Sequence, residues 1–112
     1  MADHGPTTIS ANDSIITLIN TFTCAEVHQE ELVAELDKAT EEIFAHQPGF
    51  ISVNIHASLD RTRVINYSQW ASLKDFDALQ ELPEVQKHLA QILTLVESSD
   101  PRICTVRATY HA

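Results

Sequence analysis

Two asparagines and a tryptophan stand among apolar residues, in places where their polar atoms could hold a ligand. Side chains two residues apart in a strand point to the same face. In the alternating segment RVINYSQW, the side chains of Asn66, Ser68 and Trp70 therefore point together. Asn66 and Trp70 are then ~13 Å apart along the strand, at ~3.3 Å per residue. Asn20 lies among apolar residues of its own parity in an earlier segment, LINTF.

If Asn20 and Asn66 both lie on the face of the sheet that the helices cover, both amides and the indole line one apolar cavity. A buried amide without a partner costs ~1–3 kcal/mol. Two such amides beside a tryptophan therefore indicate a pocket that orients a planar, oxygen-bearing ligand. In the plainer alternative, each asparagine pairs with a strand end or with water, and no pocket exists.

A histidine is the candidate acid or base. His88 follows Val85 by three residues and precedes Ile92 by four, which places it on the apolar face of a predicted helix. An imidazole titrates near neutral pH, so it suits proton transfer. No two of the 6 histidines have the i, i+4 or alternate-strand spacing of a ligand pair, so no metal site is predicted.

Periodicity predicts the elements that must position these residues. Segments that are rich in β-branched residues, or that alternate between apolar and polar residues, predict strands at Ser14–Thr23, Phe50–Leu59, Arg63–Trp70 and Arg102–Tyr110. Apolar residues at helical spacing predict a long helix over Val27–His46, a short helix that begins after Ser72 and a third that begins at Pro83. This β-α-β-β-αα-β order predicts the ferredoxin-like α+β fold, an antiparallel four-stranded sheet with helices on one face.

The chain is predicted to form a single domain over residues 14–112, after a polar and flexible arm over residues 1–13. Helices can cover only one face of the predicted sheet, so the other face needs a cover of its own. Two sheets that pack face to face would supply this cover. We therefore expect a homodimer through the sheet faces.

The balance of charge excludes several classes of partner. The 112 residues include 16 Asp and Glu against 7 Lys and Arg, with a net charge of −9 and no basic run. Binding to nucleic acid and to an anionic membrane surface both depend on basic residues, so neither is expected. The N-terminal segment lacks the features of a signal peptide, and no apolar run approaches ~18 residues, so we expect a cytoplasmic protein.

The two cysteines, Cys24 and Cys104, do not form a CxxC motif. Cys24 is expected at the end of the first strand and Cys104 near the start of the last. These strands are antiparallel neighbours in a ferredoxin-like sheet, so the two thiols could be close. A reducing compartment argues against a functional dithiol.

The stretch QPGFISVNIHASLDRTRVINYSQWAS (residues 47–72), with LINTF before it and LPEVQKHL after it, resembles the antibiotic biosynthesis monooxygenase family. The likeness covers residues 14–96 and rests on the order of PGF, HASLD, the N-Y-x-Q-W motif and PEV near a histidine. It implies a ferredoxin-like fold and dimers whose sheets pack into an α+β barrel. It also implies oxidation of anthrones and related phenols of aromatic polyketide pathways to quinones by O2, without metal, flavin or haem.

The resemblance also implies roles for individual residues. Asn66 and Trp70 match the pocket asparagine and tryptophan of the family and would hydrogen-bond oxygen atoms of the substrate, with Asn20 assisting from the first strand. The predicted catalytic residues are Asn66, Trp70 and His88. The predicted substrate-binding residues are Asn20, Phe22, Phe76 and Leu79. The co-substrate is molecular oxygen, and the predicted partner is a small aromatic molecule.

The chain departs from the family pattern at two places. Some members carry a pocket tyrosine six residues after the tryptophan, where this chain has Phe76, so a phenol cannot donate a proton there. Some members also place an arginine on the following helix, but the segment Pro83–Ala90 contains none. Lys87 and His88 stand there instead, which makes His88 the best candidate for the acid or base.

Two other functions are compatible with the sequence. The first is a haem-degrading monooxygenase of the same superfamily, which pairs a first-strand asparagine with a helix tryptophan and a haem-ligating histidine. Asn20 and His88 fit that pattern approximately, but Leu79 stands nine residues after Trp70, where such an enzyme has its tryptophan. The second is a non-catalytic binding or stress-related domain that binds aromatic molecules and consumes no O2.

Overall fold

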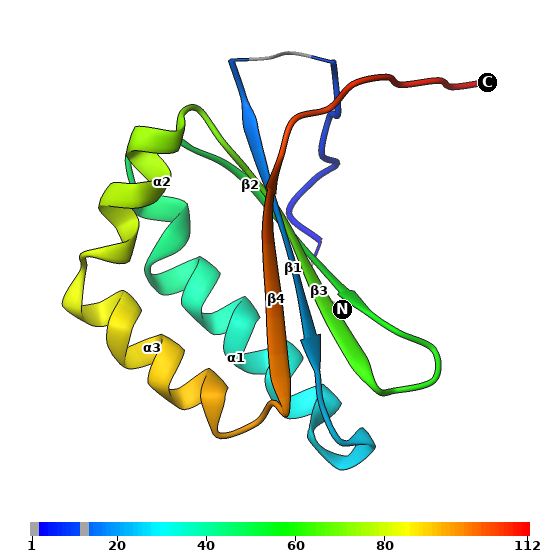
Figure 1. Cartoon of the computed structure of the whole chain (residues 1–112), viewed down its shortest axis with the longest axis vertical. Coiled ribbons are helices and arrows are strands. Elements are labelled where there is room, and N and C mark those ends of the chain that lie inside the picture. Colours follow the sequence, from blue (N-terminus) through cyan, green and yellow to red (C-terminus); the bar gives the residue numbers. More distant parts are fainter. Residues whose placement is uncertain (1–2, 12–13) are drawn as a thin grey trace.

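The computed structural model describes residues 3–11 and 14–112, and four strands form one antiparallel sheet of order β2-β3-β1-β4 (Figure 1). The strands are β1 (Ile16–Thr23), β2 (Phe50–Ala57), β3 (Arg63–Trp70) and β4 (Ser98–Cys104). The helices are α1 (Gln29–Glu42), α2 (Leu73–Gln80) and α3 (Pro83–Leu93), with short 3-10 helices over Glu26–His28 and Phe44–His46. This order of elements confirms the predicted ferredoxin-like fold.

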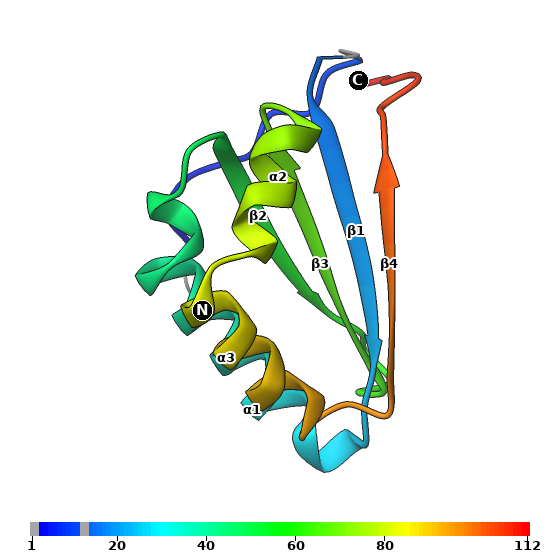
Figure 2. The ribbon, with the colours of Figure 1, turned by 60° about the vertical axis from the view of Figure 1, so that its left-hand side comes forward.

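The three helices all lie on one face of the sheet (Figures 1 and 2). The alternation in β3 decides which side chains they cover, and Val64, Asn66, Ser68 and Trp70 are all buried. Burial of one large apolar side chain contributes ~1.5–3 kcal/mol, so the apolar core between the layers holds the helices on this face. The core consists of two clusters, one of Phe22, Cys24, Leu32, Leu36, Val64 and Ile92 and one of Ala39, Phe44, Trp70, Leu79 and Val85.

The long helix predicted over Val27–His46 is shorter than expected. The α-helix covers Gln29–Glu42, and a 3-10 helix flanks it at each end. Ile43 leaves the helical conformation at φ −123° and ψ −65°, which turns Phe44 into the core. No helix in the described part of the chain, α1 included, is long and apolar enough to cross a membrane.

The position predicted for the last strand was wrong. The strand covers Ser98–Cys104, whereas the sequence pattern placed it at Arg102–Tyr110. β4 lies at the edge of the sheet with β1 as its neighbour, and all of its residues except Cys104 are exposed, so apolar alternation is absent. Pro101 resembles a turn residue in sequence, but an edge strand tolerates proline because its outer side needs no hydrogen-bond donor.

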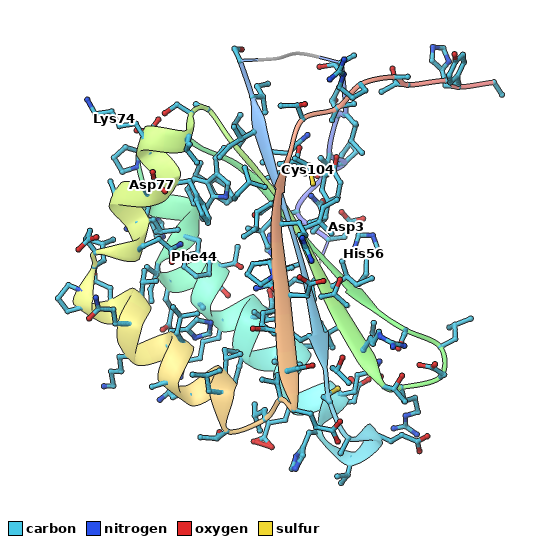
Figure 3. All side chains as sticks on the ribbon, in the orientation of Figure 1. Asp3, Phe44, His56, Lys74, Asp77 and Cys104 are labelled. Carbon is cyan, nitrogen blue, oxygen red and sulfur yellow. The ribbon has the colours of Figure 1, made fainter. Side chains whose placement is uncertain are left out.

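The two thiols are not close, contrary to the expectation from the sequence. Cys104 ends β4 and is the register partner of Thr17, near the start of β1. Cys24 follows Thr23, whose register partner is Ser98 at the other end of β4. Figure 3 places Cys104 where the chain leaves the sheet. The two cysteines therefore lie at opposite ends of the strand pair, about 20 Å apart at ~3.3 Å per residue.

Ser72 caps the N-terminus of α2 at its junction with β3, where the sequence predicted that the helix begins. The Asp75 backbone N–H donates to Ser72 Oγ at 3.1 Å, and the Ser72 hydroxyl donates to the Asp75 carboxylate at 2.9 Å. Gly49 lies against this turn with a φ of +82°, and a Cβ atom there would lie 2.5 Å from the Asp75 side chain. Glycine is therefore needed at this position, next to the start of the helix that carries Phe76.

The face of the sheet that is opposite the helices, here called the open face, carries a network of polar side chains. Ser52 Oγ donates to Gln69 Oε1 at 2.7 Å, and Asn54 Nδ2 donates to Ser52 Oγ at 3.1 Å. The Thr7 hydroxyl donates to Asn54 Oδ1, and Gln69 Nε2 donates to the Thr8 carbonyl at 3.1 Å. Part of the N-terminal segment thus hydrogen-bonds to β2 and β3.

The predicted arm covers residues 1–13, of which residues 1–2 and 12–13 lie outside the described residues. Thr7 and Thr8 make the contacts with the sheet. The flexibility of the arm stays a prediction.

Candidate active site

A cavity of about 320 Å³ lies between the covered face of the sheet and the helices. Its walls come mainly from β1, β3, α2 and α3, with Ser99 and Pro101 of β4 at one side. All of the predicted site residues line it, namely Asn20, Phe22, Asn66, Trp70, Phe76, Leu79 and His88. Among the described residues that line the cavity there is no Asp, Glu, Lys or Arg, and His88 is the one ionisable side chain. The site is therefore an apolar pocket with a few polar groups.

Two carboxamides lie side by side on the sheet. Asn20 of β1 and Asn66 of β3 are register partners, and both side chains line the cavity. Directly opposed side chains in an antiparallel pair have Cβ atoms ~4.5–5.5 Å apart. The Oδ1 atoms of both asparagines are buried and have no hydrogen-bond partner among the described residues. A buried oxygen without a partner costs ~1–3 kcal/mol, and a ligand hydroxyl that donates to it would remove this cost.

The indole of Trp70 is fixed on three sides. Its Nε1–H donates to Ser68 Oγ at 3.1 Å, and the ring is 2% exposed. Phe50 and Phe76 meet it edge to face, with ring centroids 5.7 Å and 6.0 Å away. The sequence predicted that Trp70 would hydrogen-bond a substrate oxygen, but the indole N–H is already donated to a protein group. The indole ring therefore offers the cavity an apolar surface.

Ser68 was not identified as a functional residue from the sequence. It lines the cavity, is 2% exposed and holds the only polar atom of Trp70. The alternation in β3 could have indicated Ser68, because its side chain points to the same buried face as those of Asn66 and Trp70.

His88 projects from α3 into the same cavity. It is 6% exposed, and its Nε2 atom is buried with no hydrogen-bond partner among the described residues. The Phe44 ring meets the imidazole edge to face at 5.8 Å, and Figure 3 places Phe44 on the helix side of the sheet. Burial lowers the pKa of His88 below its ordinary value, and the Glu35 carboxylate partly opposes this. The lowered pKa favours the neutral imidazole, which is the form that accepts a proton.

His88 also borders the solvent on its other side. A surface groove of about 410 Å³ runs between α1 and α3, and His88 lines both this groove and the cavity. The charged side chains that line the groove are Glu35, Lys38 and Glu42 of α1 and Glu84 and Lys87 of α3. Lys87 therefore lies outside the cavity. Among the described residues, His88 alone lines both the cavity and the charged groove.

The remaining predicted residues supply the apolar walls. Phe22 of β1 belongs to one of the two core clusters, and Phe76 and Leu79 come from α2. Phe76 stands where the resemblance implied a tyrosine in some family members, and no tyrosine or arginine among the described residues lines this cavity. Any proton transfer by a side chain of the cavity must therefore use His88 or a hydroxyl group.

A family model described as antibiotic biosynthesis monooxygenase matches residues 15–91. The chain belongs to this family. The match covers every residue of the cavity except those of α3 beyond Gln91 and those of β4. It confirms the family that the sequence motifs indicated, and it makes the protein a monooxygenase.

Similar proteins support the same assignment. Tetracenomycin-F1 monooxygenase of Streptomyces glaucescens is 37% identical over 105 residues, which are 94% of this monooxygenase and 93% of that protein. The crystal structure of SnoaB, a cofactor-independent oxygenase from Streptomyces nogalater, is 25% identical with a TM-score of 0.72, and the match covers 86% of this chain and 96% of SnoaB.

A third structure shares the fold. The monooxygenase from the gene ActVA-Orf6 of Streptomyces coelicolor, in complex with the ligand nanaomycin D, is 24% identical with a TM-score of 0.76. The match covers 87% of this chain and 91% of that one. This monooxygenase therefore has the fold of known oxygenases over most of its length.

Proposed function

We propose that this monooxygenase oxidises an anthrone-like polycyclic phenol to a quinone with O2 and without a cofactor. One oxygen atom of O2 becomes the new carbonyl oxygen. The other leaves as water, together with the two hydrogens of the oxidised carbon. The observation that carries this proposal is an apolar cavity lined by Asn20, Asn66 and His88, whose Oδ1 and Nε2 atoms are buried without partners among the described residues.

The chemistry requires little from the protein. Loss of one proton from the carbon opposite the anthrone carbonyl gives a delocalised anion that can reduce O2 directly. The protein must exclude water, orient the planar anion and accept the proton. An apolar cavity with a few fixed polar atoms meets these needs.

Asn20 and Asn66 recognise the hydroxyl groups of the substrate. Their Oδ1 atoms accept hydrogen bonds and lie on neighbouring strands, so they suit a phenol with two hydroxyl groups on one edge. The rings of Trp70 and Phe76 pack against the aromatic planes, and Phe22 and Leu79 fill the remaining wall.

His88 is the base in this proposal. Its neutral imidazole takes the proton from the substrate carbon, and the groove between α1 and α3 lies on its other side. The imidazolium returns this proton to the peroxide that the anion forms with O2, and loss of the second hydrogen as the O–O bond breaks gives the carbonyl and water. Burial lowers the pKa of His88 and so favours the unprotonated form of the base.

The relatives agree with this reaction class. SnoaB, at 25% identity, is a cofactor-independent oxygenase, and the relative at 37% identity is tetracenomycin-F1 monooxygenase. We place the present enzyme in the tailoring of aromatic polyketides in the cytoplasm.

We also infer that the enzyme works as a homodimer. Ile19, Ile65 and Tyr67 lie on the open face, where no helix covers them, and all of them are half-buried. A second sheet packed on this face would bury them fully. Size-exclusion chromatography with light scattering tests this, and a monomer at micromolar concentration would contradict it.

Oxygen uptake tests the function directly. With 1,8-dihydroxyanthrone as substrate and a chelator present, the flavin-free enzyme should consume one O2 per quinone formed, well above the rate of autoxidation in buffer. A requirement for added flavin or metal would refute the cofactor claim. Binding of the anthrone without O2 consumption would favour a non-catalytic binding domain.

A haem titration separates the superfamily alternative. Although Asn20 and His88 occupy the positions expected in a haem-degrading enzyme, Leu79 lines the cavity where that enzyme needs a tryptophan. No shift of the Soret band is expected when haem is added, and a saturable shift at one haem per chain would favour haem degradation.

A further inference from the structure

The hydrogen bond between Trp70 and Ser68 has a fixed direction. An indole N–H can only donate, so the Ser68 Oγ must accept at 3.1 Å. A serine hydroxyl has one proton and two acceptor sites, and this bond uses one acceptor site only. The Ser68 proton is therefore free to donate elsewhere. No described residue accepts it.

The surroundings of Ser68 leave the cavity as the place for an acceptor. Its register partners are Leu18 on β1 and Val53 on β2, and neither side chain can accept a hydrogen bond. Ser68 is 2% exposed and lines the cavity together with both of these residues. A ligand oxygen in the cavity is thus the natural acceptor for this proton.

Ser68 also supplies a hydrogen-bond donor, which the carboxamide oxygens cannot. The unpaired Oδ1 atoms of Asn20 and Asn66 are acceptors, and they suit hydroxyl groups of a ligand. A ligand carbonyl needs a donor, and Ser68 lies two residues from Asn66 on the same face of β3. A hydroxyl that accepts from an N–H becomes a better donor through polarisation, so the Trp70 bond strengthens it.

We propose that Ser68 is a catalytic residue whose hydroxyl donates a hydrogen bond to the carbonyl oxygen of the substrate. This rests on the proposed oxidation of an anthrone. When His88 removes the proton from the substrate carbon, negative charge develops on that carbonyl oxygen, and the Ser68 hydrogen bond stabilises it. The serine keeps its proton throughout. Trp70 is a positioning residue, because its N–H orients the Ser68 hydroxyl toward the cavity.

A set of variants tests the two roles together. Ser68→Ala should lower kcat on 1,8-dihydroxyanthrone by about 10²-fold, as the loss of one donor to a developing oxyanion does. Ser68→Thr keeps the hydroxyl and should retain most of the activity. Trp70→Phe keeps an aromatic ring, loses the N–H and should lower kcat less than Ser68→Ala. The double variant should match Ser68→Ala, because Trp70 acts through Ser68.

The fluorescence of the protein reports on the same bond. The sequence contains 1 tryptophan, so all indole emission comes from Trp70. Ser68→Ala should shift this emission to shorter wavelength, and Ser68→Thr should leave it close to that of the wild type. An unshifted spectrum in Ser68→Ala, or independent and additive losses of kcat in the double variant, would overturn the positioning role.

A binding measurement keeps this inference separate from the proposed function. The product of this oxidation, 1,8-dihydroxyanthraquinone, does not react further, and it should quench Trp70 with a Kd about fivefold weaker in Ser68→Ala than in the wild type, as for one hydrogen bond. If the wild type fails to oxidise the anthrone, the proposed function is wrong and the Kd values decide whether Ser68 binds the carbonyl. If Ser68→Ala oxidises and binds as well as the wild type, the inference about Ser68 is wrong and the proposed function stands.

Discussion

The two faces of the sheet use the same residue type in opposite ways. On the open face, Asn54 donates to Ser52 Oγ and to the Tyr67 carbonyl, both at 3.1 Å, and accepts from the Thr7 hydroxyl. On the covered face, the Oδ1 atom of Asn66 is buried with no partner among the described residues. The first asparagine therefore contributes to folding. The second costs stability until a ligand binds.

The difference shows where the molecule gives up stability for function. Buried polar groups are normally paired, and unpaired ones concentrate at functional sites. Of the buried unpaired side-chain atoms in the described residues, three belong to residues that line one cavity, namely Asn20, Asn66 and His88. The exception is the Thr17 hydroxyl, which belongs to the open face. Removal of the cavity groups should cost activity, and removal of the open-face groups should cost stability.

The largest effect is expected at His88. His88→Gln keeps a polar side chain and removes the base, so kcat should fall by about 10²–10⁴-fold. The wild type should lose activity at acid pH, where His88 is protonated, and the variant should lack this pH dependence. His56→Gln is the matched control, since His56 is an exposed histidine on the open face. Oxygen uptake measured across pH gives both results, and equal losses in the two variants would contradict the assignment.

Asn20 should show loss of activity together with a gain in stability. Asn20→Leu replaces an unpaired amide by an apolar side chain of similar size, in apolar surroundings. The free energy of unfolding should rise by about 1 kcal/mol, because the desolvation cost of the amide is removed. kcat/KM should fall at least tenfold. Urea unfolding and oxygen uptake test this, and a destabilised variant would mean that Asn20 has a structural role.

Gln69 should behave in the opposite way. It accepts from Ser52 and donates to the Thr8 carbonyl on the open face. Gln69→Ala should therefore lower the free energy of unfolding by about 1–2 kcal/mol, with activity within about twofold of the wild type. A variant as stable as the wild type would show that the open-face network contributes nothing to folding.

The smallest effect is on the pH dependence of stability. Because the pKa of His88 is lowered in the folded state, the unfolded chain binds more protons between the folded-state pKa and the ordinary value. The free energy of unfolding should therefore decline as the pH falls below about 6.5, and this contribution should be constant above it. Urea unfolding of the wild type and His88→Gln from pH 5 to 8 isolates the contribution, and parallel curves would contradict it.

Much of the covered face could be predicted from the sequence, because one strand carries the signal. The alternation in RVINYSQW places Asn66 and Trp70 on the buried parity, and the structure confirms this. Helical spacing likewise placed His88 on the buried side of α3. These patterns are local, so neighbouring residues in the chain suffice to reveal them.

Features that depend on contacts between distant segments could not be predicted from the sequence in the same way. The hydrogen bond from Trp70 to Ser68 depends on side-chain rotamers, which alternation does not specify. β4 is a polar edge strand that contains Pro101, so its sequence resembles a loop. The mistaken proximity of Cys24 and Cys104 followed directly from that error, since the register of β1 and β4 decides where each thiol lies.

One comparison of two variants tests the central claim, that polar groups on the covered face serve the substrate and those on the open face serve the fold. Asn66→Ala and Asn54→Ala make the same change on opposite faces of neighbouring strands. We expect Asn66→Ala to lose at least about tenfold in kcat/KM, because one hydrogen bond to the substrate is lost, and to unfold at the wild-type urea concentration or above it. Asn54→Ala should keep its activity and lose about 1–2 kcal/mol of stability. The reverse pattern, or equal effects in both variants, would contradict the account.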